Sequence, residues 1–324
     1  MTYLLMLAGL VLLLIGANYL VDSSVAIAKR AKISDFVIGL TIVGFGTSSP
    51  ELFISLSSAL KRMGDIALGN VLGSNICNVM LILGATAVIK PVMMERSNIK
   101  RDVPITIAVS LLLTLLCYSG LIFGEENLSL TRISGAILLI CFAAFMIYAF
   151  KSGKNQPEPV FDDAEEEKQS KISKLPVWLL SVIAVASLGL LVFGGDMFID
   201  SAVVVAKDFG MSDFVISTTI IAVGTSLPEL ITCIVAALKG NPQIALGNVL
   251  GSNIFNILMI LGVSTTIMPI HLTGVNIIDF AVMVVSAILV YIFAFTLGKR
   301  KIDRAEGVFF VLGYIAYIAY LLNK

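Results

Sequence analysis

The sequence predicts an all-helical integral membrane protein with ten transmembrane helices, arranged as two inverted five-helix repeats in which helices 2 and 7 are broken. Three observations support this prediction: the chain is strongly apolar, its apolar residues form runs of membrane-spanning length, and one long segment occurs twice. Of 324 residues, 58% are hydrophobic and 14% charged, whereas a soluble domain is about half apolar and about a quarter charged. The runs have about 20 residues, the length of a helix that crosses a hydrocarbon core. The strands of a β-barrel would instead alternate polar and apolar residues over about 10 positions.

Ten apolar segments are predicted to cross the membrane, with one polar linker between the fifth and the sixth. The segments are residues 3–21, 36–60, 66–89, 104–122, 130–150, 177–199, 214–238, 244–268, 278–297 and 306–322. The linker, 151–176, is rich in charge and poor in apolar residues, as solvated segments are. It separates a first repeat at 1–150 from a second at 177–324. The first segment lacks a basic leader, so we expect a retained helix rather than a removed signal peptide.

Basic residues concentrate on one side of this topology. If the N-terminus is outside, the connections 22–35, 90–103, 151–176, 239–243 and 298–305 are cytoplasmic and hold 17 of the 22 Lys and Arg residues. Cytoplasmic loops of membrane proteins carry an excess of Lys and Arg. We therefore predict a multi-pass protein of the plasma or inner cell membrane, with both termini outside and an acidic cytoplasmic linker.

The remaining composition narrows the classes of function. Basic and acidic residues each number 22, so the net charge is zero and nothing indicates nucleic-acid binding. We expect no enzyme activity, no cofactor and no protein partner, and the apolar composition implies contact with a lipid bilayer. His271 is expected in a surface loop. The cysteines lie in apolar segments without a CxxC pair, as small buried residues do; they are Cys77, Cys117, Cys141 and Cys233.

The segment Gly46–Gly84 recurs as Gly224–Gly262. A shift of 178 residues aligns the two without a gap, and 24 of 39 positions are identical. The similarity continues upstream, because SDFVI at 34–38 recurs at 212–216, so the two motifs span 34–84 and 212–262. Five helices per repeat make the second copy enter the membrane from the opposite side. Many secondary transporters use such inverted repeats to form a binding site near the membrane midplane.

Each copy places one glutamate inside an apolar segment. Glu51 is the single ionisable residue of 36–60, and Glu229 has the same position in 214–238. A charge at the membrane centre is unfavourable by at least ~2.5–3.5 kcal/mol, so such residues are usually functional. Their recurrence at equivalent positions favours a functional role over a purely structural one.

Each glutamate follows a sequence that breaks a helix. Pro50 and Pro228 precede the glutamates, and proline removes a backbone donor and clashes with the preceding turn. We expect the break to free backbone carbonyl oxygens, with those of Gly44 and Ala222 as candidates. A freed carbonyl at membrane depth needs a partner such as a bound cation. Neighbouring hydroxyl groups add oxygen ligands, and these belong to Thr47, Ser48, Thr225 and Ser226.

The second half of each motif, GNVLGSNICN or GNVLGSNIFN, supplies more oxygen atoms. Ser74 and Asn78 are spaced i, i+4 and share one helical face, and Ser252 and Asn256 repeat this arrangement. Glycines at small-xxx-small spacing favour close helix packing; they are Gly69, Gly73, Gly247 and Gly251. The other asparagines suit either ion ligands or hydrogen bonds between helices, and they are Asn70, Asn75, Asn248 and Asn253.

The predicted ligands are hard oxygen atoms, without a thiolate or imidazole cluster. This set favours Ca²⁺ or Na⁺ over Zn²⁺ or copper. Two carboxylates neutralise one Ca²⁺, and the same oxygens can hold Na⁺ because the two ions have similar radii. A site that holds either ion, but not both fully, is a physical basis for exchange.

At these residues the chain resembles a known family. GTSSPE with GNVLGSNICN, and GTSLPE with GNVLGSNIFN, look like the paired α-repeats of the sodium/calcium exchanger family of Ca²⁺:cation antiporters. The resemblance covers the ten-helix layout and implies a prokaryotic-type member with a short central loop. It implies Na⁺-driven Ca²⁺ transport by alternating access, at a central site between helices 2, 3, 7 and 8. It also implies that Glu51 and Glu229 coordinate Ca²⁺. Asn78 and Asn256 match the family's inner polar pair. The positions matching the family's oxygen donors for Na⁺ and Ca²⁺ are Thr47, Ser48, Ser74, Thr225, Ser226 and Ser252.

Three features depart from parts of the family's pattern. Ser49 stands where the second copy has Leu227, so the copies differ beside the glutamate. Asn256 is an amide where some members of the family have an aspartate. In the potassium-dependent branch this aspartate is associated with K⁺ use, so the resemblance favours K⁺ independence here. The linker is too short for folded Ca²⁺-sensing domains, and its acidic run at 162–167 lacks the glycine and spacing of an EF-hand loop.

Three alternative functions are compatible with parts of this pattern. A Ca²⁺/H⁺ antiporter is the nearest alternative. The pattern of proton-coupled relatives, however, has asparagine in place of the Thr-Ser pair and no proline before the glutamate, whereas both repeats here keep Thr-Ser and Pro-Glu. A cation channel would usually repeat around an axis along the membrane normal. An intramembrane acid protease would pair two aspartates. We therefore expect a Na⁺/Ca²⁺ exchanger, with Ca²⁺/H⁺ antiport as the alternative.

Overall fold

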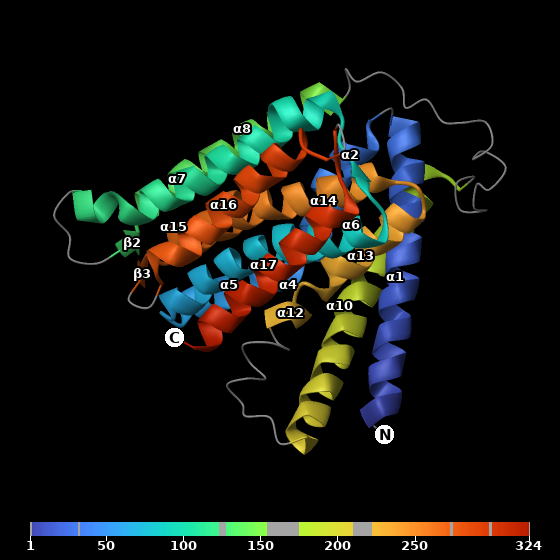
Figure 1. The fold of residues 1–324 in the computed structure, drawn as a ribbon, viewed down its shortest axis with the longest axis horizontal. Coiled ribbons are helices and arrows are strands. Elements are labelled where there is room, and N and C mark those ends of the chain that lie inside the picture. The colour runs from blue at the N-terminus through green and yellow to red at the C-terminus, as the bar shows by residue number, and fades with distance from the viewer. Residues whose placement is uncertain are drawn as a thin grey trace. The chain divides into compact units, whose positions relative to one another are not determined.

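The computed structural model describes residues 2–31, 33–122, 128–153, 175–209, 222–272, 275–297 and 300–323. Most of these residues are helical, and short strands lie in the connections (Figure 1). Within the described ranges, seven helices are long and apolar enough to cross a membrane, and the broken pair Asp35–Thr47 and Ser49–Leu60 makes an eighth. Two shorter apolar helices, Leu227–Leu238 and Ile277–Phe293, occupy the predicted seventh and ninth segments. Helices therefore occur at all ten predicted positions.

Two helices extend beyond the predicted segments. Helix α1 covers Thr2–Ala31 and α10 covers Val177–Asp208, whereas the apolar runs end near 21 and 199. In α1 the extension is amphipathic rather than uniformly apolar, because Ala26, Ile27 and Ala28 are buried while Lys29 is half-buried and Arg30 is exposed. A helix can thus extend beyond the apolar run that predicts it, where only one of its faces is apolar. Most of the linker 151–176, and residues 210–221 with the start of the second motif, lie outside the described residues.

The helices form two compact units. The first unit comprises Met1–Thr47 and Ile147–Asn248, and the second unit comprises Ser48–Met146 and Val249–Lys324. Each unit therefore contains segments of both sequence repeats. Repeat and compact unit are different divisions of this chain.

In the first unit, α1 and α10 pack along one another (Figure 1). Glycines allow the two backbones to approach closely. A Cβ atom at Gly9 would lie 2.8 Å from the Gly194 carbonyl oxygen, and one at Gly16 would lie 2.9 Å from the Ser187 carbonyl oxygen. The other elements of this unit are α2 (Asp35–Ile38), the π-helix η1 (Gly39–Val43), α3 (Gly44–Thr47), α12 (Ala222–Gly224), α13 (Leu227–Leu238) and α14 (Pro242–Phe255) up to residue 248.

In the second unit, α4 (Ser49–Leu60), α5 (Gly64–Ile76) and the π-helix η6 (Asn256–Leu261) contact one another. The long helix α17 (Arg304–Leu322) packs on α6 (Gly84–Ile89), where a Cβ atom at Gly307 would lie 2.7 Å from the Gly84 carbonyl oxygen. The other helices of this unit are η2 (Cys77–Leu83), η3 (Asn98–Asp102), α7 (Val103–Ile122), α8 (Arg132–Gly153) up to residue 146, α15 (Gly262–Ile267) and α16 (Ile277–Phe293).

Two pairs of short strands join connections of the second unit. β1 (Val92–Met93) pairs antiparallel with β4 (Lys301–Ile302), and β2 (Leu128–Leu130) pairs antiparallel with β3 (Ile270–Leu272). Strands can pair in this way only if their connections lie on the same side of the membrane. The predicted topology meets this condition for both pairs, which supports the count of helices between them.

The packing of α1 on α10 predicts opposite effects for two glycine substitutions in α10. A Cβ atom at Gly194 would lie 2.9 Å from the Gly9 carbonyl oxygen, whereas one at Gly189 would meet nothing within 4 Å. Gly194→Ala should destabilise the protein by about 1–3 kcal/mol, as overpacking does. Gly189→Ala should be neutral or raise stability by up to about 1 kcal/mol through helix propensity. Thermal unfolding of both purified variants tests this, and equal unfolding temperatures would contradict the close packing.

Candidate cation-binding site

The second and seventh membrane segments are interrupted at equivalent residues. Ser48 (φ −82°, ψ 10°) precedes α4, and Ser226 (φ −92°, ψ 8°) precedes α13. Pro50 and Pro228 then occupy the first turn of the new helix, where a backbone N–H has no intrahelical acceptor and proline is tolerated. The prolines therefore start a second helix rather than merely bending one.

This interruption places both glutamates at a helix N-terminus. Glu51 lies in the first turn of α4 and Glu229 in the first turn of α13. Their side chains are 1% and 2% exposed, respectively. The first turn of a helix carries partial positive charge from its backbone N–H groups, which favours a carboxylate there. The local fold thus supplies part of the electrostatic compensation that each buried carboxylate needs.

The predicted ligands are distributed between the two compact units. The second unit contains Ser48, Glu51, Ser74, Asn78, Ser252 and Asn256. The first unit contains Gly44, Thr47, Ala222, Thr225, Ser226 and Glu229. In the second unit Glu51, Ser74 and Asn256 come from three helices that contact one another, namely α4, α5 and η6. In the first unit α13, which carries Glu229, contacts α3, which carries Thr47.

Nearly all the described ligand side chains are buried. Thr225 is the half-buried member of the set. Gly44 and Ala222 are the first residues of α3 and α12, and their role as carbonyl ligands stays a prediction. The fully or nearly fully buried side chains belong to Thr47, Ser48, Glu51, Ser74, Asn78, Ser226, Glu229, Ser252 and Asn256.

Four asparagines of the second unit form a reciprocal hydrogen-bond network. The side-chain amide of Asn75 donates to the backbone carbonyl of Asn253 (3.3 Å), and that of Asn253 donates to the backbone carbonyl of Asn75 (3.3 Å). Each side chain uses its NH₂ group for this contact, so its oxygen faces away from the backbone carbonyl of the other residue. The Asn253 side-chain oxygen accepts from the Asn78 NH₂ group (3.0 Å), and the Asn75 side-chain oxygen accepts from the Asn256 NH₂ group (3.0 Å). Asn75 and Asn253 thus join two helices, which resolves one of the alternatives that the sequence left open.

In the same network, the side-chain oxygens of Asn78 and Asn256 receive no hydrogen bond from the described residues. Their NH₂ groups are used as donors, and their Oδ1 atoms are buried without a hydrogen-bond partner among the described residues. The hydroxyl oxygen of Ser226, in the first unit, is buried in the same condition. A buried acceptor without a partner is unfavourable by about 1–3 kcal/mol, and a bound cation or water would relieve this. Asn78 and Asn256 therefore have the properties of ligands.

Asn70 and Asn248 are held by equivalent partners in the two repeats. Asn70 donates to the Ser55 hydroxyl (2.9 Å) and to the Glu51 carbonyl (3.2 Å). Asn248 donates to the Cys233 sulfur (3.2 Å), and its oxygen lies 3.1 Å from the Thr47 hydroxyl, which donates to it. Both asparagines thus hold helices together beside the glutamate-bearing segments.

Two structural features of the site were missed by sequence reasoning. Cys233 is fully buried, as expected of a small apolar residue, but its thiol also contacts the Ala245 carbonyl (3.6 Å) and orients Asn248. The aligned position in the first copy is Ser55, whose hydroxyl contacts the Ala67 carbonyl (3.3 Å). This serine–cysteine correspondence was the available signal. The other feature is the pair of π-helices, η2 and η6, which begin beside Asn78 and at Asn256; π-turns often mark functional sites, but no sequence pattern indicated them.

The site chemistry is that of hard oxygen donors. Within the described ranges, no three His, Cys, Asp or Glu side chains gather into a group that could hold a metal ion. Each unit instead contains one of the two glutamates together with hydroxyl groups, and the second unit also contains the amide oxygens of Asn78 and Asn256. Such a set suits Ca²⁺ or Na⁺, which prefer oxygen ligands.

Comparisons with known proteins agree with this chemistry. The family model of the sodium/calcium exchanger protein matches residues 1–151 and 179–323. The protein CaxA of Alkalimonas amylolytica is 40% identical over 326 residues, which cover 98% of this chain and 97% of CaxA. The sodium/calcium exchanger MaX1 of Methanosarcina acetivorans is 32% identical over 343 residues, which cover 98% of each protein.

A solved structure shows the same fold. The sodium–calcium exchanger NCX_Mj, soaked with Na⁺ and Ca²⁺, superposes with a TM-score of 0.79 at 32% identity, covering 98% of this chain and 97% of that one. The predicted all-helical, multi-pass membrane fold is thereby confirmed, and the channel and protease alternatives are set aside in favour of a secondary transporter. The chain belongs to the sodium/calcium exchanger family.

Proposed function

We propose that this protein exchanges Na⁺ for Ca²⁺ across a cell membrane by alternating access. The observation that carries the proposal is the buried glutamate in the first turn of a helix that follows a Thr-Ser break, once in each repeat. A membrane-embedded carboxylate is rarely structural. Two of them suit a divalent cation, because their combined charge of −2 neutralises one Ca²⁺. Similarity to exchangers that are named for sodium and calcium supports the same ion pair.

The proposed ligands follow from the repeat and from the donors within each unit. Glu51 and Glu229 would supply the charge, and Asn78 and Asn256 would supply amide oxygens that have no hydrogen-bond donor within the described residues. The carbonyls of Gly44 and Ala222 are further candidates. Hydroxyl oxygens would complete the coordination of Ca²⁺ or Na⁺, and they belong to Thr47, Ser48, Ser74, Thr225, Ser226 and Ser252.

Competition for these oxygens would couple the two ions. Na⁺ and Ca²⁺ have similar radii, so each can use the same donors, but the site cannot hold both fully. Occupation by either ion would satisfy the buried acceptors and permit exposure to the other side of the membrane. We further propose residence in the plasma or inner membrane, with both termini outside, because 17 of 22 basic residues then lie in cytoplasmic connections.

Ca²⁺/H⁺ antiport remains the second candidate, and the residues beside the glutamates argue against it. Both repeats keep Thr-Ser and Pro-Glu, so each glutamate has hydroxyl oxygens next to it. Hydroxyl groups are Na⁺ ligands but do not titrate near neutral pH. We therefore assign the driving force to Na⁺.

Replacing either glutamate by its isosteric amide should abolish transport. Purified native protein in Na⁺-loaded vesicles should take up Ca²⁺ when external Na⁺ is removed. Glu51→Gln and Glu229→Gln should reduce uptake to the level of empty vesicles, because each removes one of two charges that balance Ca²⁺. Glu95→Gln is the matched control, since Glu95 is exposed in the connection between α6 and α7, and this variant should transport like the native protein.

Two outcomes would contradict the proposal. Unimpaired uptake by either site variant would remove that glutamate from the site. Equal Ca²⁺ uptake driven by a pH gradient without Na⁺ would move the function to Ca²⁺/H⁺ antiport.

A further inference from the structure

The turn after α4 contains an arginine in a backbone conformation that favours glycine. Arg62 has φ 60°, and the aligned residue of the second repeat, Gly240, has φ 83°. Both residues end a helix in the same way: Arg62 N donates to the Ala59 carbonyl (2.9 Å) and Gly240 N to the Ala237 carbonyl (3.1 Å). The left-handed region is strained for residues with a Cβ atom. The first repeat therefore retains an arginine where glycine would serve the turn better.

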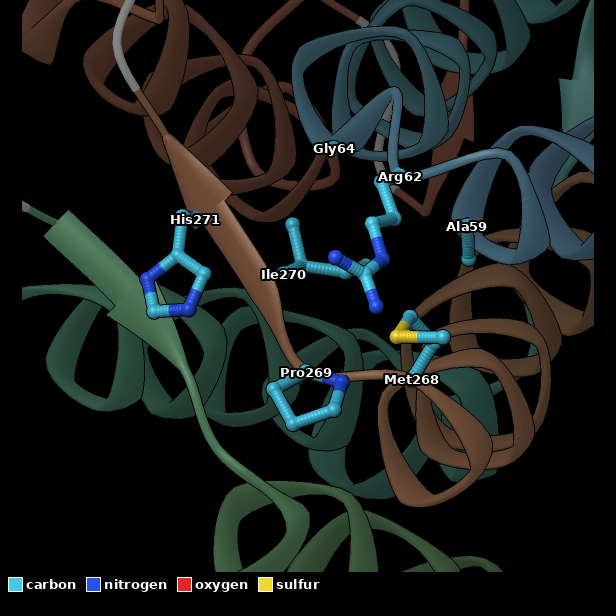
Figure 2. Close-up of a pocket in the computed structure, with 7 residues that line it drawn as sticks. All are labelled: Ala59, Arg62, Gly64, Met268, Pro269, Ile270 and His271. Carbon is cyan, nitrogen blue, oxygen red and sulfur yellow. The ribbon is translucent and has the colours of Figure 1, made fainter.

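The side chain of Arg62 lies over a cavity of about 210 Å³ in the second unit. Figure 2 shows the guanidinium extending from the turn toward Ile270 and Met268, while the ring of His271 points to the other side of its strand. Ala59, Met268, Pro269 and Ile270 contribute apolar walls. The cavity thus combines one cationic group with an apolar lining.

Within the described residues, Arg62 forms no ion pair with a carboxylate. The carbonyls at the end of α4 are already paired, since the amides of Lys61, Arg62 and Met63 donate to Ser57, Ala59 and Ser58, respectively. The guanidinium therefore retains donors for an external acceptor, and guanidinium groups bind phosphate with two parallel hydrogen bonds.

The cavity lies at the ends of two membrane segments. Helix α4 ends at Leu60 and α15 ends at Ile267, and both helices belong to apolar segments of membrane-spanning character. Helix ends of this kind lie at the depth of lipid headgroups, where basic side chains meet phosphates. The distribution of Lys and Arg predicts that this end is the outer one.

We propose that the cavity beneath Arg62 binds the phosphate group of an anionic phospholipid from the outer leaflet. The guanidinium would hold the phosphate, and the apolar walls would contact the adjoining glycerol and acyl groups. Inorganic phosphate could also contact the guanidinium, but it has no glycerol or acyl groups that would contact the apolar walls. The lipid is therefore the better-matched source of the anion, and the binding stabilises the α4–α5 turn that follows the Glu51 helix.

Arg62→Gly separates this role from a structural one, because the two roles predict opposite effects on stability. The thermal unfolding temperature of the purified protein is measured in detergent alone, with added phosphatidylglycerol, with phosphatidylcholine at the same mole fraction, and with sodium phosphate. Phosphatidylglycerol should raise the unfolding temperature of the native protein by about 2–4 °C and exceed the other two additions. Arg62→Gly should unfold at the same or a higher temperature in detergent, because glycine relieves the turn, and should lose the rise.

Lys61→Gln is the matched control, because Lys61 is an exposed neighbour that does not line the cavity; it should keep most of the rise. Arg62→Lys should keep only part, since an ammonium group lacks the planar fork. A rise with sodium phosphate that Arg62→Gly abolishes would support the site with soluble phosphate as its ligand. An equal rise in native protein and Arg62→Gly, or an equal loss in Lys61→Gln, would overturn the proposal.

Discussion

The structure depends on one electrostatic constraint, the burial of a carboxylate among apolar helices. Glu51 and Glu229 are almost completely removed from solvent, and an isolated charge there would be strongly unfavourable. The broken helices provide a first answer. In the interior of a continuous helix, the N–H groups near each glutamate would be bonded within that helix. The break instead places the glutamate in the first turn of a new helix, where the backbone carries partial positive charge. In the proposed function, a bound cation would further compensate these charges, so the local fold and the proposed ion binding would answer the same constraint.

The asparagine side chains near the candidate site form two sets of hydrogen bonds between helices. Asn75 and Asn253 bond each other's backbone, and they also fix the NH₂ groups of Asn78 and Asn256. Asn70 and Asn248 are fixed by Ser55 and Cys233. These contacts use the NH₂ groups of Asn78 and Asn256, so the Oδ1 atoms of these two residues are the ones left without a donor among the described residues. Such an arrangement is pre-organised for a cation that needs several oxygen ligands at set positions.

The sequence was sufficient for the fold, and it singled out the residues of the candidate site, whose role as ligands stays a prediction. Apolar runs reveal membrane segments, and a repeat of 24 identities in 39 positions reveals polar residues that packing alone would not preserve. Finer geometry leaves no such pattern. The π-helices η2 and η6 depend on tertiary packing, the extension of α1 to Ala31 depends on an amphipathic stripe, and the contact between Cys233 and Asn248 depends on two helices meeting. The positive φ of Arg62 is a property of the folded turn, and the aligned Gly240 was its only trace in the sequence.

The central claim is that Ca²⁺ and Na⁺ compete for one set of oxygens, and equilibrium Ca²⁺ binding to the purified protein tests it most directly. Calorimetric titration with Ca²⁺ would be repeated at increasing Na⁺, with K⁺ replacing Na⁺ at equal ionic strength as the control. The account predicts that Na⁺ weakens Ca²⁺ binding far more than K⁺ does, since screening affects both salts equally. Ca²⁺ affinity that falls equally with both salts, or that is independent of Na⁺, would contradict it.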